Sequence, residues 1–194
     1  MLNIKKGQPW IFWPSSICDT LPEKPGNKIL SGDQYFKLTF RLILKDSSSE
    51  QKTLFTIVPR FTGLDLHPDK MKLTITCEDK TEYIDLPTLI EVNKEAEIQL
   101  EHMPNTFFKL FINSNEVYNL DLVDRSYGIA DSPHIIIGAG NFPKNDFNLN
   151  YTEFDLLEFK LEDKNEVVAH HIFEEFIFDK SVDITDNCNF IHKL

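Results

Sequence analysis

The chain has 194 residues, of which 41% are hydrophobic and 26% are charged, so it can bury one sizeable core and is too apolar to be disordered. Twenty lysines and arginines against 31 aspartates and glutamates give a net charge of −11. This charge excludes nucleic acid as an expected partner, because phosphate backbones are repelled.

The sequence predicts neither a leader nor a membrane span. Its first 16 residues, MLNIKKGQPWIFWPSS, lack the continuous apolar run of a signal peptide, and no run approaches the roughly 18 apolar residues of a membrane helix. The three cysteines are an odd number without C-x-x-C spacing, which disfavours a disulfide framework and a zinc site. We expect reduced thiols and, provisionally, a cytoplasmic location or a place in an intracellularly assembled particle.

Residues 1–30 are predicted to form an arm. Their four prolines prevent a long regular element, yet Trp10 and Trp13 are too apolar to be left in water. We expect the two rings to cover an edge or end of the core, with a ligand-stacking role as the alternative. The arm would then pack on a single domain that spans residues 1–194, because no linker or repeat marks a second one.

The first strand is predicted over residues 35–45, where apolar and polar side chains alternate at period two. Its expected core face consists of Phe36, Leu38, Phe40, Leu42 and Leu44. A polar turn at 46–50 leads to a short strand at 53–58, and we expect these two strands to form a hairpin.

Most of the remaining chain also has strand periodicity. Further strands are predicted at residues 62–66, 71–78, 80–86, 96–101, 107–112, 116–122, 134–137 and 154–161. Residues 86–94 fit a short helix, and residues 167–178 fit either a helix or, as their context favours, a strand. The turn Asn113-Ser114-Asn115 is the strongest hairpin signal, because asparagine tolerates the positive φ of tight turns.

This series of short strands indicates an all-β fold, a two-sheet antiparallel sandwich or jelly roll. The segments FKLTFRLIL (36–44), TLFTI (53–57), FKLFIN (108–113), IIIG (135–138) and FDLLEFKL (154–161) follow one another in a familiar order. This order resembles the concanavalin A-like lectin and glucanase superfamily, particularly its laminin-G-like members. The resemblance implies a lectin-like fold for about two thirds of the chain.

Residues 153–158, EFDLLE, fit the E-x-D-x-x-E pattern of laminarinase and lichenase type glucanases. The resemblance implies Glu153 as nucleophile, Asp155 as assistant and Glu158 as acid/base of a retaining hydrolase. A bulge between Leu156 and Leu157 would bring Glu158 onto the face of the other two. The apolar residues of the same stretch already explain it as a core strand whose alternation shifts by one residue at a bulge, and we favour this interpretation.

The loop that precedes this strand carries side chains suited to a ligand. Carboxylate and amide oxygens hold calcium or sugar hydroxyls, and phenylalanine rings stack on apolar sugar faces. The candidate ligand-binding residues are Asn141, Phe142, Asn145, Asp146 and Asn148, of which Asp146 and Asn148 are the candidates for calcium. The alternative is a polar surface loop that uses asparagine and glycine for turn geometry.

The six histidines have no metal-binding spacing, and His170 and His171 are expected on opposite faces of a strand. Our leading hypothesis is a non-catalytic module, without a required cofactor, that binds carbohydrate or a protein surface. The first alternative is a glycoside hydrolase that uses Glu153 and Glu158. The second is a structural scaffold in a homo-oligomer or larger assembly.

Overall fold

The computed structural model describes thirteen segments of the chain. These are residues 1–4, 10–12, 34–45, 52–58, 62–66, 70–77, 80–87, 90–123, 134–138, 152–164, 167–173, 182–183 and 190–192. The strands among them are β1 (Leu2–Ile4), β2 (Trp10–Phe12), β3 (Phe36–Leu44), β4 (Lys52–Val58), β5 (Thr62–Leu66), β6 (Met71–Cys77), β7 (Lys80–Leu86), β8 (Glu95–Met103), β9 (Phe107–Ile112), β10 (Asn115–Asp121), β11 (His134–Ile137), β12 (Phe154–Glu162), β13 (Val167–Ile172), β14 (Val182–Asp183) and β15 (Phe190–His192). No helix occurs in these segments, and so none that could cross a membrane.

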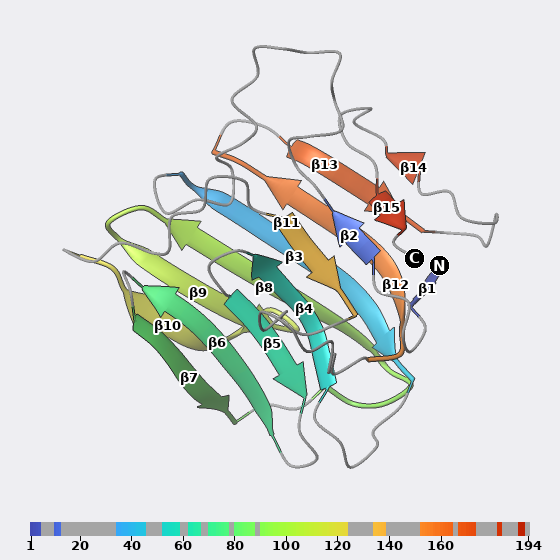
Figure 1. The fold of residues 1–194 in the computed structure, drawn as a ribbon, viewed down its shortest axis with the longest axis horizontal. Coiled ribbons are helices and arrows are strands. Elements are labelled where there is room, and N and C mark those ends of the chain that lie inside the picture. Colours follow the sequence, from blue (N-terminus) through green and yellow to red (C-terminus); the bar gives the residue numbers. More distant parts are fainter. Residues whose placement is uncertain are drawn as a thin grey trace, which may run out of the picture.

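The strands form two antiparallel sheets that overlap in the view of Figure 1. One sheet has eight strands in the order β10-β9-β8-β3-β12-β13-β14, with β1 also paired to β12. The other has seven strands in the order β15-β2-β11-β4-β5-β6-β7. The buried side chains of both sheets form one core between them. The predicted all-β, two-sheet antiparallel sandwich is thereby confirmed.

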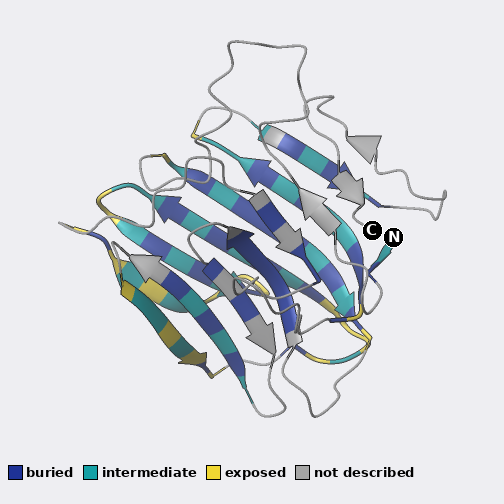
Figure 2. Ribbon diagram, viewed as in Figure 1, coloured by how far each residue is buried: buried dark blue, intermediate teal, exposed yellow. Residues whose placement is uncertain are grey.

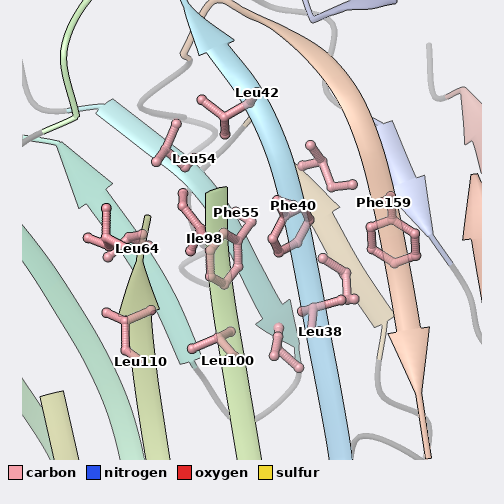
Figure 3. Close-up of a cluster of buried hydrophobic side chains, with 14 of the residues drawn as sticks. Leu38, Phe40, Leu42, Leu54, Phe55, Leu64, Ile98, Leu100, Leu110 and Phe159 are labelled. Carbon is pink, nitrogen blue, oxygen red and sulfur yellow. The ribbon is translucent and has the colours of Figure 1, made fainter. Parts of the chain in front are cut away.

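The middle of the core is built on β3. Its five predicted core residues are at most 3% exposed, which confirms the face read from the sequence. In Figure 3, Phe40 of β3 lies beside Phe55 of β4 and Phe159 of β12. The ring centroids of Phe40 and Phe55 are 4.7 Å apart in a stacked pair, and those of Phe40 and Phe159 are 5.5 Å apart edge to face. One aromatic cluster therefore joins the two sheets and two neighbouring strands.

Burial alternates along the strands of the eight-stranded sheet. In β8 and β9 every second residue is buried, and most of the residues between are partly exposed, as the bands of Figure 2 show. Because successive side chains of a strand point to opposite faces, one face of this sheet lies in the core and the other faces outward. We call the second face the outer face.

Two expectations about chain connections are wrong. Strands β3 and β4 do not form a hairpin, because β3 pairs with β8 and β12 whereas β4 pairs with β5 and β11. The chain changes sheets between them, and strand periodicity carries no information about this change. The short helix expected over residues 86–94 is also absent from its described residues, where 90–94 form turns and irregular backbone.

The predicted strand at 167–178 is confirmed for Val167–Ile172, and residues 174–178 lie outside the described segments. Parts of the expected N-terminal arm are strands in the sheets themselves. Strand β1 pairs with β12 in the eight-stranded sheet, and β2 lies between β11 and β15 in the other. Trp13 lies outside the described segments.

The predicted hairpin at Asn113 is confirmed. Strands β9 and β10 pair from Ile112 and Asn115 onward, and the two residues between them, Asn113 and Ser114, have φ of 51° and 64°. Two consecutive positive φ values are typical of the tight turn whose twist matches that of the flanking strands. The side-chain oxygen of Asn113 also accepts a hydrogen bond from the backbone N–H of Glu97, at 2.9 Å, so it fixes the turn to β8.

Replacing Ser114 by glycine is expected to stabilise the fold. Serine is strained at a φ of 64°, whereas glycine adopts this conformation freely. The relief of this backbone strain is partly offset by the greater conformational freedom of glycine in the unfolded chain. The net effect predicts an increase of a few tenths to about 1 kcal/mol in the free energy of unfolding. Urea unfolding of Ser114→Gly measures it. Asn113→Ala is the opposing control and should destabilise, and a loss of stability in Ser114→Gly would contradict the assignment of the turn.

Candidate functional site

The predicted ligand loop lies between two residues, Gly138 and Thr152, that are held by hydrogen bonds; we call these two residues the base of the loop. Strand β11 belongs to the seven-stranded sheet and β12 to the other, so the intervening residues cross between sheets. At the base, the N–H of Gly138 donates to the carbonyl of Leu54 at 2.7 Å, and the N–H of Thr152 donates to the carbonyl of Gly138 at 3.2 Å. The hydroxyl of Thr152 donates to the carbonyl of Thr53 at 2.7 Å. Gly138 and Thr152, which flank residues 139–151, are therefore hydrogen-bonded to each other and to β4.

Gly138 is required at this base for two reasons. Its φ is +84°, a conformation that residues with a side chain rarely adopt. A Cβ atom added there would also lie 2.3 Å from Cγ2 of Ile4, far inside van der Waals contact. Ile4 belongs to β1 and is fully buried, so the N-terminal strand packs directly against the start of the loop.

The candidate ligand residues themselves lie outside the described segments. These are Asn141, Phe142, Asn145, Asp146 and Asn148. The calcium site at Asp146 and Asn148 therefore stays a prediction. Among the described residues, no three His, Cys, Asp or Glu side chains are grouped so as to hold a metal ion.

Strand β12 follows the loop and contains the predicted bulge. Its register against β3 shifts between Leu156 and Glu158, so Leu157 is the additional residue. Phe154 and Leu156 before the shift and Phe159 after it are all buried. The extra residue therefore keeps the apolar side chains in the core and places Glu158 with Asp155 on the outer face.

Asp155 is occupied by structural contacts. Its side chain is 5% exposed, and one carboxylate oxygen lies 2.6 Å from Nζ of Lys45. The other accepts a hydrogen bond of 2.9 Å from Nδ2 of Asn3. Because both oxygens are engaged, Asp155 fastens β1 and the end of β3 to β12.

Glu158 lies in the middle of a polar chain that crosses four adjacent strands. Oε2 of Glu158 accepts a hydrogen bond from Nη1 of Arg41 at 2.8 Å, and Oε1 lies 2.7 Å from Nε2 of His170. Nε and Nη2 of Arg41 donate to the same oxygen of Glu95, at 2.8 and 2.5 Å. The chain therefore runs from β13 through β12 and β3 to β8 along the outer face.

The surroundings of Glu158 favour its ionised form. Partial burial raises the pKa of Glu158, but the hydrogen bonds from Arg41 and His170 together outweigh burial, so the pKa lies below its ordinary value. Hydrogen bonds to Glu95 and Glu158 likewise raise the pKa of Arg41. A glycosidase acid/base needs a raised pKa in order to donate a proton near neutral pH. The electrostatics of Glu158 are therefore the opposite of those that the hydrolase alternative requires.

Glu153, the third member of the pattern, precedes β12 and is exposed. Its backbone carbonyl accepts a hydrogen bond from the N–H of Lys45 at 3.2 Å. The structure thus places Asp155 and Glu158 in separate ion pairs and Glu153 at the end of the strand. The hydrolase alternative stays a prediction that this geometry does not favour.

The partners of these acids were not predicted from the sequence. Arg41, Lys45 and Glu95 lie 54 residues or more along the chain from the acids or cations that they contact. Their positions on the outer face could be read from the alternation of β3 and β8, but the pairing depends on strand register. His170 and His171 do lie on opposite faces as expected, because His171 is fully buried and His170 contacts Glu158.

Comparison with known proteins identifies the fold. No protein-family model matches the sequence, and no curated protein matches it. Among solved structures, the CBM40 domain of Ruminococcus gnavus IT-sialidase, bound to α2,3-sialyllactose, is similar with a TM-score of 0.54 and 13% identity. Domains LG4-5 of the mouse laminin α1 chain give a TM-score of 0.54 at 6% identity, and the botulinum neurotoxin serotype D binding domain gives 0.52 at 13%. The predicted likeness to concanavalin A-like and laminin-G-like jelly rolls is confirmed for the fold.

The extent of these similarities differs between the structures. The match covers 86% of this chain and 91% of the CBM40 domain. It covers 85% of this chain but 42% of the laminin chain, and 83% of this chain but 37% of the toxin chain. The chain therefore spans less than half the length of these two proteins.

Replacing Gly138 by alanine is expected to destabilise the fold by about 2 to 4 kcal/mol. The unfavourable φ contributes about 1 to 2 kcal/mol and displacement of the Ile4 side chain contributes the rest. Thermal or urea unfolding measures the loss.

The matched control is the same substitution in an Ile4→Ala background, where the clashing methyl group is absent. Ile4→Ala is itself destabilising because Ile4 is buried, but the further effect of Gly138→Ala should fall to about 1 to 2 kcal/mol. Additive effects of the two substitutions would contradict the described contact.

Replacing Glu158 by glutamine removes its charge from the ion pair with Arg41 and is expected to destabilise the fold by about 1 to 2 kcal/mol at neutral pH. The effect is limited because Arg41 is partly exposed and water screens the ion pair. Because the folded-state pKa of Glu158 is lowered, its contribution is fully present above its ordinary value of 4.5. This contribution is lost as the pH falls through the folded-state pKa of Glu158.

Urea unfolding of the unaltered chain and of Glu158→Gln between pH 7 and pH 3 measures this effect. The difference between their free energies of unfolding should become smaller at the acid end. A difference independent of pH would contradict this role, and the exposed Glu153→Gln is the control.

Proposed function

We propose that this chain is a non-catalytic binding module whose ligand is a carbohydrate or a glycan-bearing protein surface. The observation that carries the proposal is the hydrogen-bonded base, Gly138 and Thr152, from which the predicted ligand loop between β11 and β12 would extend. Loops that are held on a rigid scaffold are the usual places for binding residues, because a loop that is already ordered loses less conformational entropy when it binds. Here the base is held by backbone hydrogen bonds and by the buried hydroxyl of Thr152.

The composition of the loop supports the same proposal. Asn145, Asp146 and Asn148 would supply oxygens to sugar hydroxyls or to a calcium ion that bridges to them, while Phe142 would stack on the apolar face of a sugar ring. The likeness to a CBM40 domain that holds a sialylated sugar, over most of both chains, is consistent with this assignment. Fold alone does not determine function, so the loop residues carry the specific claim.

The geometry of the acids supports a non-catalytic role. The carboxylate of Asp155 contacts Lys45 and Asn3. The carboxylate of Glu158 contacts Arg41 and His170. Both acids therefore stabilise the sheet, and neither has a free oxygen for a substrate. The structural scaffold remains the second alternative, and the oligomeric state in solution tests it.

A glycan array with the unaltered chain, with and without calcium, tests the proposal. Binding is expected, and substitution of Asn145, Asp146 and Asn148 together by alanine should weaken it at least about tenfold, because each lost hydrogen bond to the ligand weakens binding severalfold. Where calcium is held, it should also raise the melting temperature of the unaltered chain but not that of the variant.

The control is Asp85→Ala on β7, an exposed carboxylate whose removal changes the net charge by the same amount as Asp146→Ala. It should leave glycan binding unchanged. Unchanged binding in the loop variant would overturn the assignment to this loop. Release of reducing ends from a β-glucan, lost in Glu158→Gln, would support the hydrolase alternative instead.

A further inference from the structure

The outer face of the eight-stranded sheet carries a small group of ligand-type side chains on β8 and β9. Gln99 of β8 lies directly opposite Phe111 of β9, and Glu97 lies two residues before Gln99 on the same face. Opposite residues have Cβ atoms about 5 Å apart, and alternate residues of a strand are about 7 Å apart. We call these three residues the Phe111 platform, and all three are partly exposed.

The backbone beneath the Phe111 platform is held firmly. The N–H of Glu97 donates to the side chain of Asn113, and the N–H of Asn113 donates to the carbonyl of Glu97 at 2.8 Å. Strand β8 lies between β3 and β9 within the sheet (Figure 1). The three side chains therefore stand on a preorganised surface, which lowers the entropy lost on binding.

The platform side chains differ from their neighbours in having no partner among the described residues. The ring of Phe111 makes no ring contact there, and the side chains of Gln99 and Glu97 make no hydrogen bond or ion pair there. Glu97 lies opposite Arg41, yet Arg41 contacts Glu95 and Glu158 instead.

Phe107, the other phenylalanine of this face on β9, differs in this respect. Nζ of Lys109 lies 5.1 Å from the centre of its ring, and Lys109 also pairs with Glu116 at 2.9 Å. Phe107 is thus already covered by a cation, whereas Phe111 presents a ring beside an amide and a carboxylate. This combination suits a ligand with an apolar face and several hydroxyl groups.

The charges around the platform select against an anionic ligand. Arg41, which lies opposite Glu97, and Lys109, two residues from Phe111, are both paired with carboxylates, and the carboxylate of Glu97 has no cationic partner among the described residues. At this platform the acidic group of a sialylated or sulfated sugar would be repelled by Glu97, whereas a neutral sugar would not.

We propose that the Phe111 platform is a second binding surface, which takes a neutral pyranose unit of a glycan. The C–H face of the sugar stacks on Phe111, the amide of Gln99 donates and accepts hydrogen bonds, and Glu97 accepts from sugar hydroxyls. The inference rests on the proposed function, because it adds a second contact surface to the same binding module.

The test is an array of neutral, sialylated and sulfated oligosaccharides, followed by titration of the best neutral glycan. Phe111→Ala should weaken this binding about tenfold and Gln99→Ala severalfold, in proportion to a lost stacking contact and a lost hydrogen bond. Phe111→Tyr should retain it. The matched control is Tyr83→Ala on β7 of the other sheet, which removes an aromatic side chain from a residue that is 69% exposed and should change nothing.

Melting curves check that every variant is folded, and Gln99→Ala remains decisive where Phe111→Ala does not fold. Unchanged affinity in the folded platform variants, or binding confined to sialylated or sulfated sugars, would overturn the inference. Binding that is lost in the variant of Asn145, Asp146 and Asn148 but kept in Phe111→Ala would overturn it while leaving the proposed function in place. No binding of the unaltered chain to any glycan would overturn both the inference and the carbohydrate part of that function.

Discussion

The contact between Phe40 and Phe55 is the interaction on which the sandwich depends, because it joins the central strand of one sheet to the opposite sheet. Phe159 completes the cluster from β12, edge to face with Phe40. Phe159 reaches this position only because Leu157 is an additional residue in β12. Without the bulge, Phe159 would face outward and Glu158 would enter the core, so packing requires the irregularity.

The same bulge explains the acidic pattern of β12. Once Phe159 is held in the core, Glu158 must face outward, where Arg41 and His170 are available from the neighbouring strands. The spacing that resembles a catalytic signature is therefore a consequence of an apolar strand that changes phase. Its acids stabilise cross-strand register, since each carboxylate can meet these cations in only one alignment. This accounts for a lowered rather than raised pKa at Glu158.

How far the sequence predicts this structure depends on the range of the interaction concerned. Period-two alternation is local, so it located β3 and its buried face, and the asparagine at position 113 identified the β9–β10 turn. The consecutive leucines at 156 and 157 also gave the bulge, because no regular strand buries both Leu156 and Phe159. Sheet membership is not local, and this is why β3 and β4 were wrongly expected to pair. The partners of Glu158 depend on register between distant strands and could not be predicted.

The proposed binding surfaces depend on outward side chains, which the fold does not determine as it determines the core. Likeness to other jelly rolls at 13% identity or less shows the fold, but it does not define which side chains face outward. On the outer face Arg41, Asp155 and Glu158 are already paired, so a ligand would have to break those contacts before it gained new ones. Gln99 and Glu97 on β8, whose side chains have no such partner within the described segments, can bind a ligand without that loss. Specificity in this fold is therefore best sought where the cross-strand pairing is incomplete.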